Sequence, residues 1–146
     1  MHIAIGSDHA AWEAKTELVA HLRAAGHQVD DLGTHNGDST DYPRFAHAVA
    51  RKVAAGTAER GFLLCGSGIG MSIAANKVRG ARAALVHDEN TAGLARKHND
   101  ANIACLGARL IPTDAIISIA EVFLDTAFEG GRHATRVGMI EPATSC

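Results

Sequence analysis

The chain has 146 residues, of which 47% are hydrophobic and only 4% aromatic, and its formal net charge is −2. This length fits one domain over residues 1–146, with a core built from alanine, valine, isoleucine and leucine. The near-neutral charge gives no basis for binding nucleic acid or an anionic membrane, and no apolar run reaches the ~18 residues of a membrane span.

Strands and helices are expected to alternate along the whole chain. Strands are expected at residues 2–7, 28–32, 61–65, 81–86 and 103–106. Helices are expected at residues 10–25, 42–55, 69–77, 87–100, 113–128 and 132–140. Five strand–helix alternations without hairpin signals predict an α/β protein, a three-layer αβα Rossmann-like fold with a five-stranded parallel sheet and a short C-terminal helix. The pattern also places the first and third strands side by side.

Cysteine usage and the N-terminus bear on the cellular compartment. Cys65, Cys105 and Cys146 are odd in number, far apart and not arranged as C-x-x-C. This favours reduced thiols over a disulfide framework. The chain enters its first strand without a basic segment or a cleavage-like signal, so a cytoplasmic protein is expected.

Residues 63–77 carry the strongest chemical signal. They read Leu-Leu-Cys-Gly-Ser-Gly-Ile-Gly-Met-Ser-Ile-Ala-Ala-Asn-Lys, a pattern typical of a strand, a glycine-rich loop and a helix. Glycines let backbone N–H groups approach an anion, and the helix start adds its dipole. Thiols beside helix N-termini ionise readily and act as bases or nucleophiles. The alternative is a tight turn with a buried, inert Cys65.

Other polar groups follow the predicted strands or end the predicted helices. Asp8 and His9 follow the first strand and Arg109 follows the fifth, at the edge where α/β folds bind ligands. Asp8 could instead cap the helix that comes next. His98 lies near a helix C-terminus, where its only role could be a favourable interaction with the helix dipole.

Two arginines complete this set of candidates. Arg132 and Arg136 are four residues apart, so they share one helix face and suit a phosphate, although an ordinary solvated face is the alternative. The nine histidines show no metal-ligand spacing, so no metal site is predicted. His133 is expected to be a surface or internally satisfied residue.

Several segments together resemble the type B ribose-5-phosphate isomerases, within the family that includes galactose-6-phosphate isomerase subunits. The matching segments are residues 6–9, 40–43, 65–70, 72–77, 98–100 and 130–133 with Arg136. They occur in the family's order and cover nearly the whole chain. Some members carry a glutamate at the position of Met71, so the presence of Cys65 indicates the cysteine branch.

The resemblance implies reversible aldose–ketose isomerisation of ribose 5-phosphate and ribulose 5-phosphate through a cis-enediolate, without metal or organic cofactor. Cys65 corresponds to the base, and Asp8 and Ser67 correspond to groups that handle protons or substrate hydroxyls. His98 corresponds to the ring-opening group. The substrate-binding set implied by the resemblance comprises His9, Tyr42, Gly66, Gly68, Gly70, Asn99, Arg109, Arg132 and Arg136.

The resemblance also implies a homodimer with shared active sites, with a tetramer as a further option, because His98, Asn99 and the arginines reach the site from the neighbouring subunit. It further implies the sheet order 2-1-3-5-4. Three alternatives stay open at this point. They are an isomerase of another sugar phosphate (of a tetrose, galactose 6-phosphate or allose 6-phosphate), a non-catalytic phosphosugar-binding module, and an NAD-binding oxidoreductase suggested by the glycine loop and Asp88.

Overall fold

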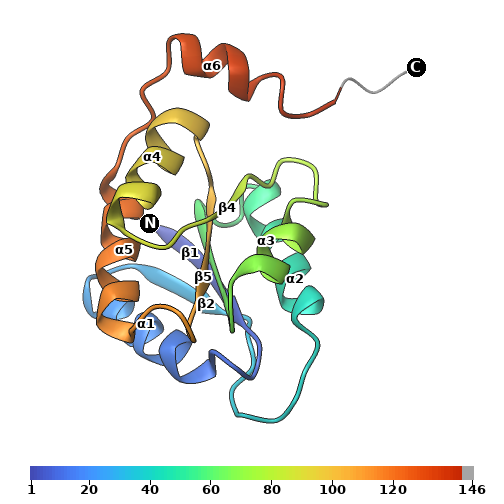
Figure 1. Ribbon diagram of the computed structural model, residues 1–146, viewed down its shortest axis with the longest axis vertical. Coiled ribbons are helices and arrows are strands. Elements are labelled where there is room, and N and C mark those ends of the chain that lie inside the picture. Colours follow the sequence, from blue (N-terminus) through green and yellow to red (C-terminus); the bar gives the residue numbers. More distant parts are fainter. Residues whose placement is uncertain (143–146) are drawn as a thin grey trace.

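The computed structural model describes residues 1–142, so Cys146 lies outside the described residues. The strands are β1 (His2–Ser7), β2 (Gln28–Asp31), β3 (Arg60–Cys65), β4 (Ala83–Leu85) and β5 (Ile103–Gly107). The helices are α1 (Trp12–Ala24), α2 (Tyr42–Ala54), α3 (Ile69–Ala75), α4 (Glu89–Asn99), α5 (Thr113–Asp125) and α6 (Arg132–Val137). Figure 1 shows the sheet between two layers of helices, with α6 beyond one end of it.

All five strands are parallel and lie in the order β2-β1-β3-β5-β4, which confirms both the predicted sheet and the order that the resemblance implied. The chain moves outward from β1 to β2 and then returns to place β3 on the other side of β1. Such a reversal opens a crevice beyond the carboxyl ends of the two central strands. The pairing of Ser7 with Leu64 brings the residues that follow β1 next to the end of β3.

The core consists of two apolar layers, one on each face of the sheet. Along β1, Ile3 and Ile5 face the layer formed with α1, α4 and α5, whereas Ala4 faces the layer formed with α2 and α3. This alternation follows from the two-residue period of a strand, and it buries a central strand on both faces. Phe62 and Phe123 pack edge to face in the first layer, with ring centroids 5.7 Å apart. Of the helices within residues 1–142, none has both the length and the apolar character needed to cross a bilayer.

Helix ends differ from the predicted ones where tertiary contacts compete with local pattern. α5 ends at Asp125 instead of 128 because Arg96 Nε donates to the carbonyl of Thr126, 3.3 Å away. The Glu129 N–H then donates to the carbonyl of Lys97 at 3.1 Å, which holds the departing chain against the end of α4. α6 ends at Val137 instead of 140, with Gly138 as its C-cap.

Two other elements start later or are shorter than predicted. α1 begins at Trp12 instead of residue 10, because residues 8–11 form a turn in which the Ala11 N–H donates to the Asp8 carbonyl at 3.3 Å, and Ala11 is the non-helical N-cap. β4 covers only Ala83–Leu85 of the predicted 81–86, since the Arg82 N–H donates to the Asn102 side chain instead of to a neighbouring strand.

A buried ion pair ties α1 to the end of β2. The Lys15 side chain is 0% exposed, and its Nζ lies 2.7 and 2.6 Å from the two carboxylate oxygens of Asp31. Removing one partner of such a pair leaves an uncompensated charge in the protein interior, which is far more costly than losing an exposed pair.

We therefore expect Asp31→Asn to lower the free energy of unfolding by about 3–5 kcal/mol in urea denaturation. The matched control is Asp30→Asn, at the adjacent residue, whose partners Lys52 and His2 are 39% and 28% exposed. This control is expected to cost at most about 1 kcal/mol. Equal costs for the two variants would contradict the special role of the buried pair.

Candidate active site

The candidate site is built on the turn between β3 and α3. Cys65 is the last residue of β3 and is 5% exposed, and its Sγ accepts a hydrogen bond from the Gly68 N–H at 3.1 Å. Gly68 has φ +78°, a left-handed conformation that disfavours side chains. A Cβ at Gly68 would also lie 2.7 Å from Leu85 Cδ1 and 3.0 Å from the carbonyl carbon of Leu106. The turn that directs an N–H at the thiol therefore requires glycine for two independent reasons.

A cavity of about 340 Å³ opens over this turn. It is lined by Asp8, Tyr42, Cys65, Gly66, Ser67, Gly70, Arg109 and Leu110. All of these except Leu110 are predicted site residues, so the fold brings this part of the candidate site together at the carboxyl edge of the sheet. Leu110 is 65% exposed and could not be predicted from the sequence, because an isolated leucine carries no chemical signal.

Asp8 is held at the cavity by a local turn. The carboxylate is largely buried, and its Oδ1 accepts from the Ala10 N–H at 2.9 Å, while the Asp8 N–H donates to the carbonyl of Leu64 at 3.2 Å. The interpretation of Asp8 as a helix cap is wrong, because the N-cap of α1 is Ala11. The carboxylate is instead fixed between β1 and β3, beside the end of the strand that carries Cys65.

Arg109 places a positive charge over the glycine loop. A Cβ at Gly66 would lie 3.2 Å from Arg109 Nη1. The guanidinium can therefore pack closely against the loop because residue 66 has no side chain. The Arg109 N–H donates to the carbonyl of Gly66 at 3.1 Å, and the Ala108 N–H donates to the carbonyl of Cys65 at 2.9 Å. These bonds join the loops after β3 and β5 into one unit.

Two aromatic or imidazole groups flank the loop. A Cβ at Gly70 would lie 2.6 Å from Tyr42 Cζ, so the absence of a side chain there lets the phenol ring pack on the start of α3. His9 Nδ1 accepts from the Thr40 N–H at 3.3 Å. His9 lines an adjacent cavity of about 190 Å³ at the start of α1, instead of the Cys65 cavity itself.

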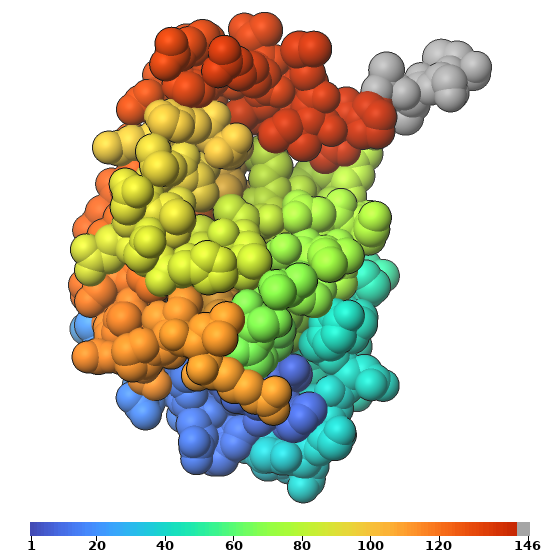
Figure 2. Space-filling model, in the orientation of Figure 1, coloured from blue at the N-terminus to red at the C-terminus, as the bar shows by residue number. Residues whose placement is uncertain are grey.

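The remaining predicted residues lie at the other edge of the sheet. α4 starts beyond the carboxyl end of β4 and runs back, so His98 and Asn99 at its C-terminus are carried away from Cys65. Arg132 and Arg136 belong to α6, which Figure 2 shows in red at one end of the molecule. Within one chain, these four residues do not line the Cys65 cavity.

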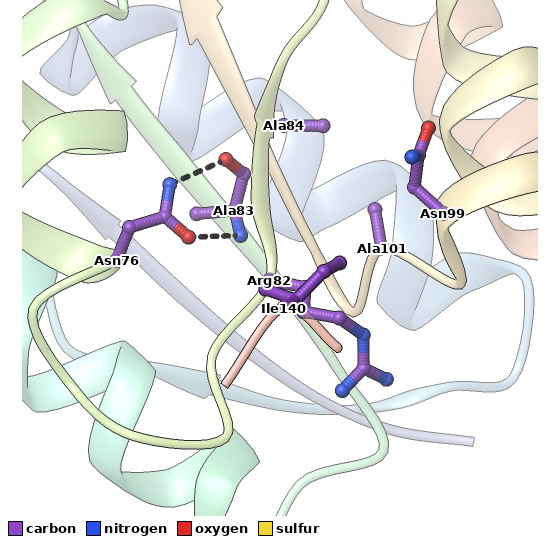
Figure 3. Close-up of a pocket in the computed structure, with 7 residues that line it drawn as sticks. All are labelled: Asn76, Arg82, Ala83, Ala84, Asn99, Ala101 and Ile140. Carbon is purple, nitrogen blue, oxygen red and sulfur yellow. Dashed lines mark hydrogen bonds between the residues drawn. The ribbon is translucent and has the colours of Figure 1, made fainter. Parts of the chain in front are cut away.

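Asn99 lines a different cavity of about 220 Å³, drawn in Figure 3. Its lining consists of Asn76, Arg82, Ala83, Ala84, Asn99, Ala101 and Ile140. The Asn76 amide donates to the Ala83 carbonyl at 2.8 Å and accepts from the Ala83 N–H at 2.9 Å. Its polar groups therefore hold β4 in place and are already hydrogen-bonded within the protein. The lining is mostly small and apolar, and it contains no acid, base or nucleophile.

His98 has a partner that the sequence did not reveal. Its ring stacks on that of His133, with centroids 4.3 Å apart and an interplanar angle of 9°. Glu129 Oε2 lies 3.8 Å from His98 Nε2 and 3.6 Å from His133 Nε2. Burial, followed by the nearby charge of His98 and Arg132, lowers the pKa of His133. His133 is buried, which excludes the surface position and leaves the other expected environment, an internally satisfied side chain.

Comparison with known proteins agrees with this geometry. A sequence model of the Ribose/Galactose Isomerase family matches residues 3–140. The chain belongs to this family. It is 44% identical to ribose-5-phosphate isomerase B of Escherichia coli over 138 residues, which cover 94% of this chain and 93% of the relative.

Solved structures of family members superpose closely on the fold. A ribose 5-phosphate isomerase of Thermotoga maritima gives a TM-score of 0.95 at 46% identity, covering 97% of this chain and 98% of that one. Ribose-5-phosphate isomerase B of Mycoplasma genitalium, solved with bound ribulose 5-phosphate, gives a TM-score of 0.92 at 43% identity, covering 95% and 93%. The parallel sheet and the arrangement of helices are therefore those of the family.

The turn at Gly68 generates a stability prediction. Gly68→Ala combines a left-handed φ with overlap against Leu85 and the β5 backbone, whereas Gly26 has φ +87° with nothing within 4 Å of an added Cβ. We expect Gly26→Ala to cost about 1 kcal/mol from strain alone, and Gly68→Ala to cost at least about 1–3 kcal/mol more, measured by urea denaturation. Equal costs would show that the turn relaxes around an added methyl group.

Proposed function

We propose that the protein is an aldose–ketose isomerase that interconverts ribose 5-phosphate and ribulose 5-phosphate, with Cys65 as the base. The observation that carries this proposal is that Cys65 lines one cavity together with Asp8 and Arg109. Family membership supports an isomerase over a dinucleotide-dependent oxidoreductase or a binding module. The named activity of the Escherichia coli relative and the sugar bound to the Mycoplasma genitalium relative support the choice of pentose phosphate.

In the proposed reaction the Cys65 thiolate removes the proton from C2 of the open-chain aldose and delivers it to C1. The electron pair released at C2 passes into an enediolate, so negative charge develops on a sugar oxygen. Backbone N–H groups of the loop at residues 66–70 lie at the start of α3 and can donate to that oxygen. The Asp8 carboxylate moves a proton between the two enediolate oxygens, and the Ser67 hydroxyl bonds a substrate hydroxyl.

The positions of the charged groups suggest how the rest of the substrate is held. Arg109 stands beside the reacting end, within the same cavity as Cys65. His9, at the start of α1, contributes to the phosphate site from the same chain. Holding the phosphate away from C1 and C2 supplies remote binding energy that orients the reacting carbons.

We further propose that two chains form a homodimer in which each completes the other's site. His98 would open the sugar ring, and Asn99, Arg132 and Arg136 would hold the substrate, all from the partner subunit. The support is topological, because these residues end α4 or form α6 at the opposite edge of the sheet from Cys65. In a two-fold dimer, one contact of this kind is necessarily repeated in reverse, which gives two equivalent sites.

Exposed apolar side chains give a second line of support for the dimer. Leu110 at the cavity and Ile69 and Ile73 on α3 are 65%, 51% and 57% exposed. Met139 and Ile140, directly after α6, are 76% and 49% exposed. Docking the α6 end of one subunit against the cavity of the other would cover both groups. Pairing of dimers into a tetramer stays an option, and the need for a reduced Cys65 supports a cytoplasmic location.

The first functional prediction concerns Cys65. With ribose 5-phosphate as substrate, EDTA present and no nicotinamide, Cys65→Ala is expected to lower kcat by about 10²–10⁴-fold, because the proton-transferring group is lost. Circular dichroism checks that the variant folds.

The matched control is Cys105→Ala, a second buried thiol on the same face of the sheet. Cys105 is 0% exposed and lies outside the cavity, so this variant is expected to retain turnover. Full turnover by Cys65→Ala would contradict the thiolate base. Turnover of a tetrose or hexose phosphate in place of ribose 5-phosphate would move the assignment to another sugar.

The second functional prediction tests site sharing by mixing subunits. Cys65→Ala and His98→Asn are each expected to be strongly impaired alone. After co-refolding in equal amounts, random pairing makes half of the dimers mixed, and each mixed dimer has one site with both groups intact. We therefore expect about a quarter of wild-type activity to return.

Size-exclusion chromatography with light scattering confirms that the mixture is dimeric or tetrameric. If both groups act within one chain, every chain in the mixture is defective and no activity returns. That result, with intact oligomers, would contradict the shared site.

A further inference from the structure

Three potential metal ligands converge at the end of α4, outside the Cys65 cavity of the same chain. They belong to His98, Glu129 and His133, and one potential ligand atom of each residue lies within 4.8 Å of the other two. The carboxylate is 3.8 and 3.6 Å from the two imidazole nitrogens. These separations are longer than a hydrogen bond but close to the ~3.4 Å between neighbouring ligand atoms of a tetrahedral zinc ion with bonds near 2.1 Å.

The backbone holds the segments that carry these side chains together. The Glu129 N–H donates to the carbonyl of Lys97 at 3.1 Å, which fixes Glu129 beside His98. Gly130 and Gly131 follow with φ +68° and +55°, and the His133 N–H donates to the carbonyl of Gly130 at 3.0 Å. This left-handed turn directs both Glu129 and the first turn of α6 toward the end of α4.

The two imidazole rings present their nitrogens on one side. The rings are stacked at an angle of 9°, and both Nε2 atoms face Glu129. A shared metal ion needs the ring planes to tilt toward each other. The His98 side chain is 40% exposed and has room to tilt, whereas His133 is only 8% exposed and supplies a fixed ligand.

We propose that His98, Glu129 and His133 form an inhibitory binding site for a transition-metal dication such as Zn²⁺. Two imidazoles and one carboxylate are a ligand set that zinc accepts, with a fourth position left to water. Arg132 and Arg136 on α6 oppose a cation electrostatically, and the Glu129 carboxylate offsets part of that charge. The expected binding is therefore reversible.

The consequence for activity rests on the proposed function, in which His98 opens the furanose ring. A metal ion that takes the Nε2 lone pair of His98 removes that nitrogen from proton transfer. Ribose 5-phosphate, which is mostly cyclic, needs this step. Ribulose 5-phosphate cannot close a furanose ring, because its 5-hydroxyl is esterified, so its conversion is expected to be less sensitive to the metal. The sequence predicts no metal site here, because the three ligands are not arranged in a local motif.

The test is titration of the full-length dimer with Zn²⁺ alone, in a non-chelating buffer, by isothermal calorimetry. We expect one ion per chain for the wild type, and binding weakened by more than about tenfold in His133→Asn and in Glu129→Gln. His21→Asn is the matched control. His21 also lies beside a carboxylate, with its Nε2 2.8 Å from Glu121 Oε1, but it does not belong to the three-ligand cluster. This variant is expected to bind like the wild type. Cys65→Ser should also keep the site.

Activity is measured in parallel with and without Zn²⁺ in both directions of the reaction. Stronger inhibition with ribose 5-phosphate than with ribulose 5-phosphate, relieved by His133→Asn, would support the proposal. No zinc binding, binding lost in Cys65→Ser, or binding that survives both ligand variants would overturn the site. Binding at the site without inhibition would overturn the inhibitory role. A protein that binds zinc as expected but isomerises neither sugar would overturn the proposed function and leave the metal site standing.

Discussion

The hydrogen bond from the Gly68 N–H to the Cys65 thiol is the contact on which the candidate site depends. It exists only because residue 68 adopts φ +78°, and that conformation is held by close packing against β5. The same packing is reinforced at Gly107, where a Cβ would lie 2.7 Å from the carbonyl carbon of Ser67. A strained turn persists when its surroundings fix it in this way. The central sheet is therefore more than a support for the loop, because the β3–β5 pair determines where the N–H points.

Parallel sheet topology imposes a second constraint, because it limits which residues of one chain can lie close together. Each strand delivers its last residue to the carboxyl edge, and each helix returns the chain to the opposite edge. Cys65 and Asp8 follow strands, so they meet. His98 ends a helix and Arg136 lies in one at the same far edge, so they are separated from Cys65 by the length of the sheet. A two-fold arrangement of chains is the simplest way to bring both edges into one site, and it does so without any change in the fold.

Local pattern was enough to predict the sheet, the alternation of elements and the half of the site that follows strands. Short apolar runs such as 103–106 are distinctive, and Cys65 stands out because its glycine loop is contiguous in sequence. The errors occur where a distant residue decides the outcome. α5 ends early because Arg96, on another helix, bonds the carbonyl of Thr126, and no pattern within 113–128 records that contact. The environment of His133 could not be predicted for the same reason, because its stacking on His98 depends on how α6 docks against α4.

The two buried thiols show how position within the sheet separates chemical roles. Cys65 and Cys105 face the same apolar layer from neighbouring strands. Cys105 is in the interior of β5 and is 0% exposed, and burial, followed by the proximity of Cys65, raises the pKa of its thiol. Cys65 is the final residue of its strand, where the carboxyl edge supplies an N–H donor, the Arg109 guanidinium and a cavity. Of these two thiols, the one at the strand end is therefore the one that a substrate in the cavity can meet, which suits Cys65 to act as a base.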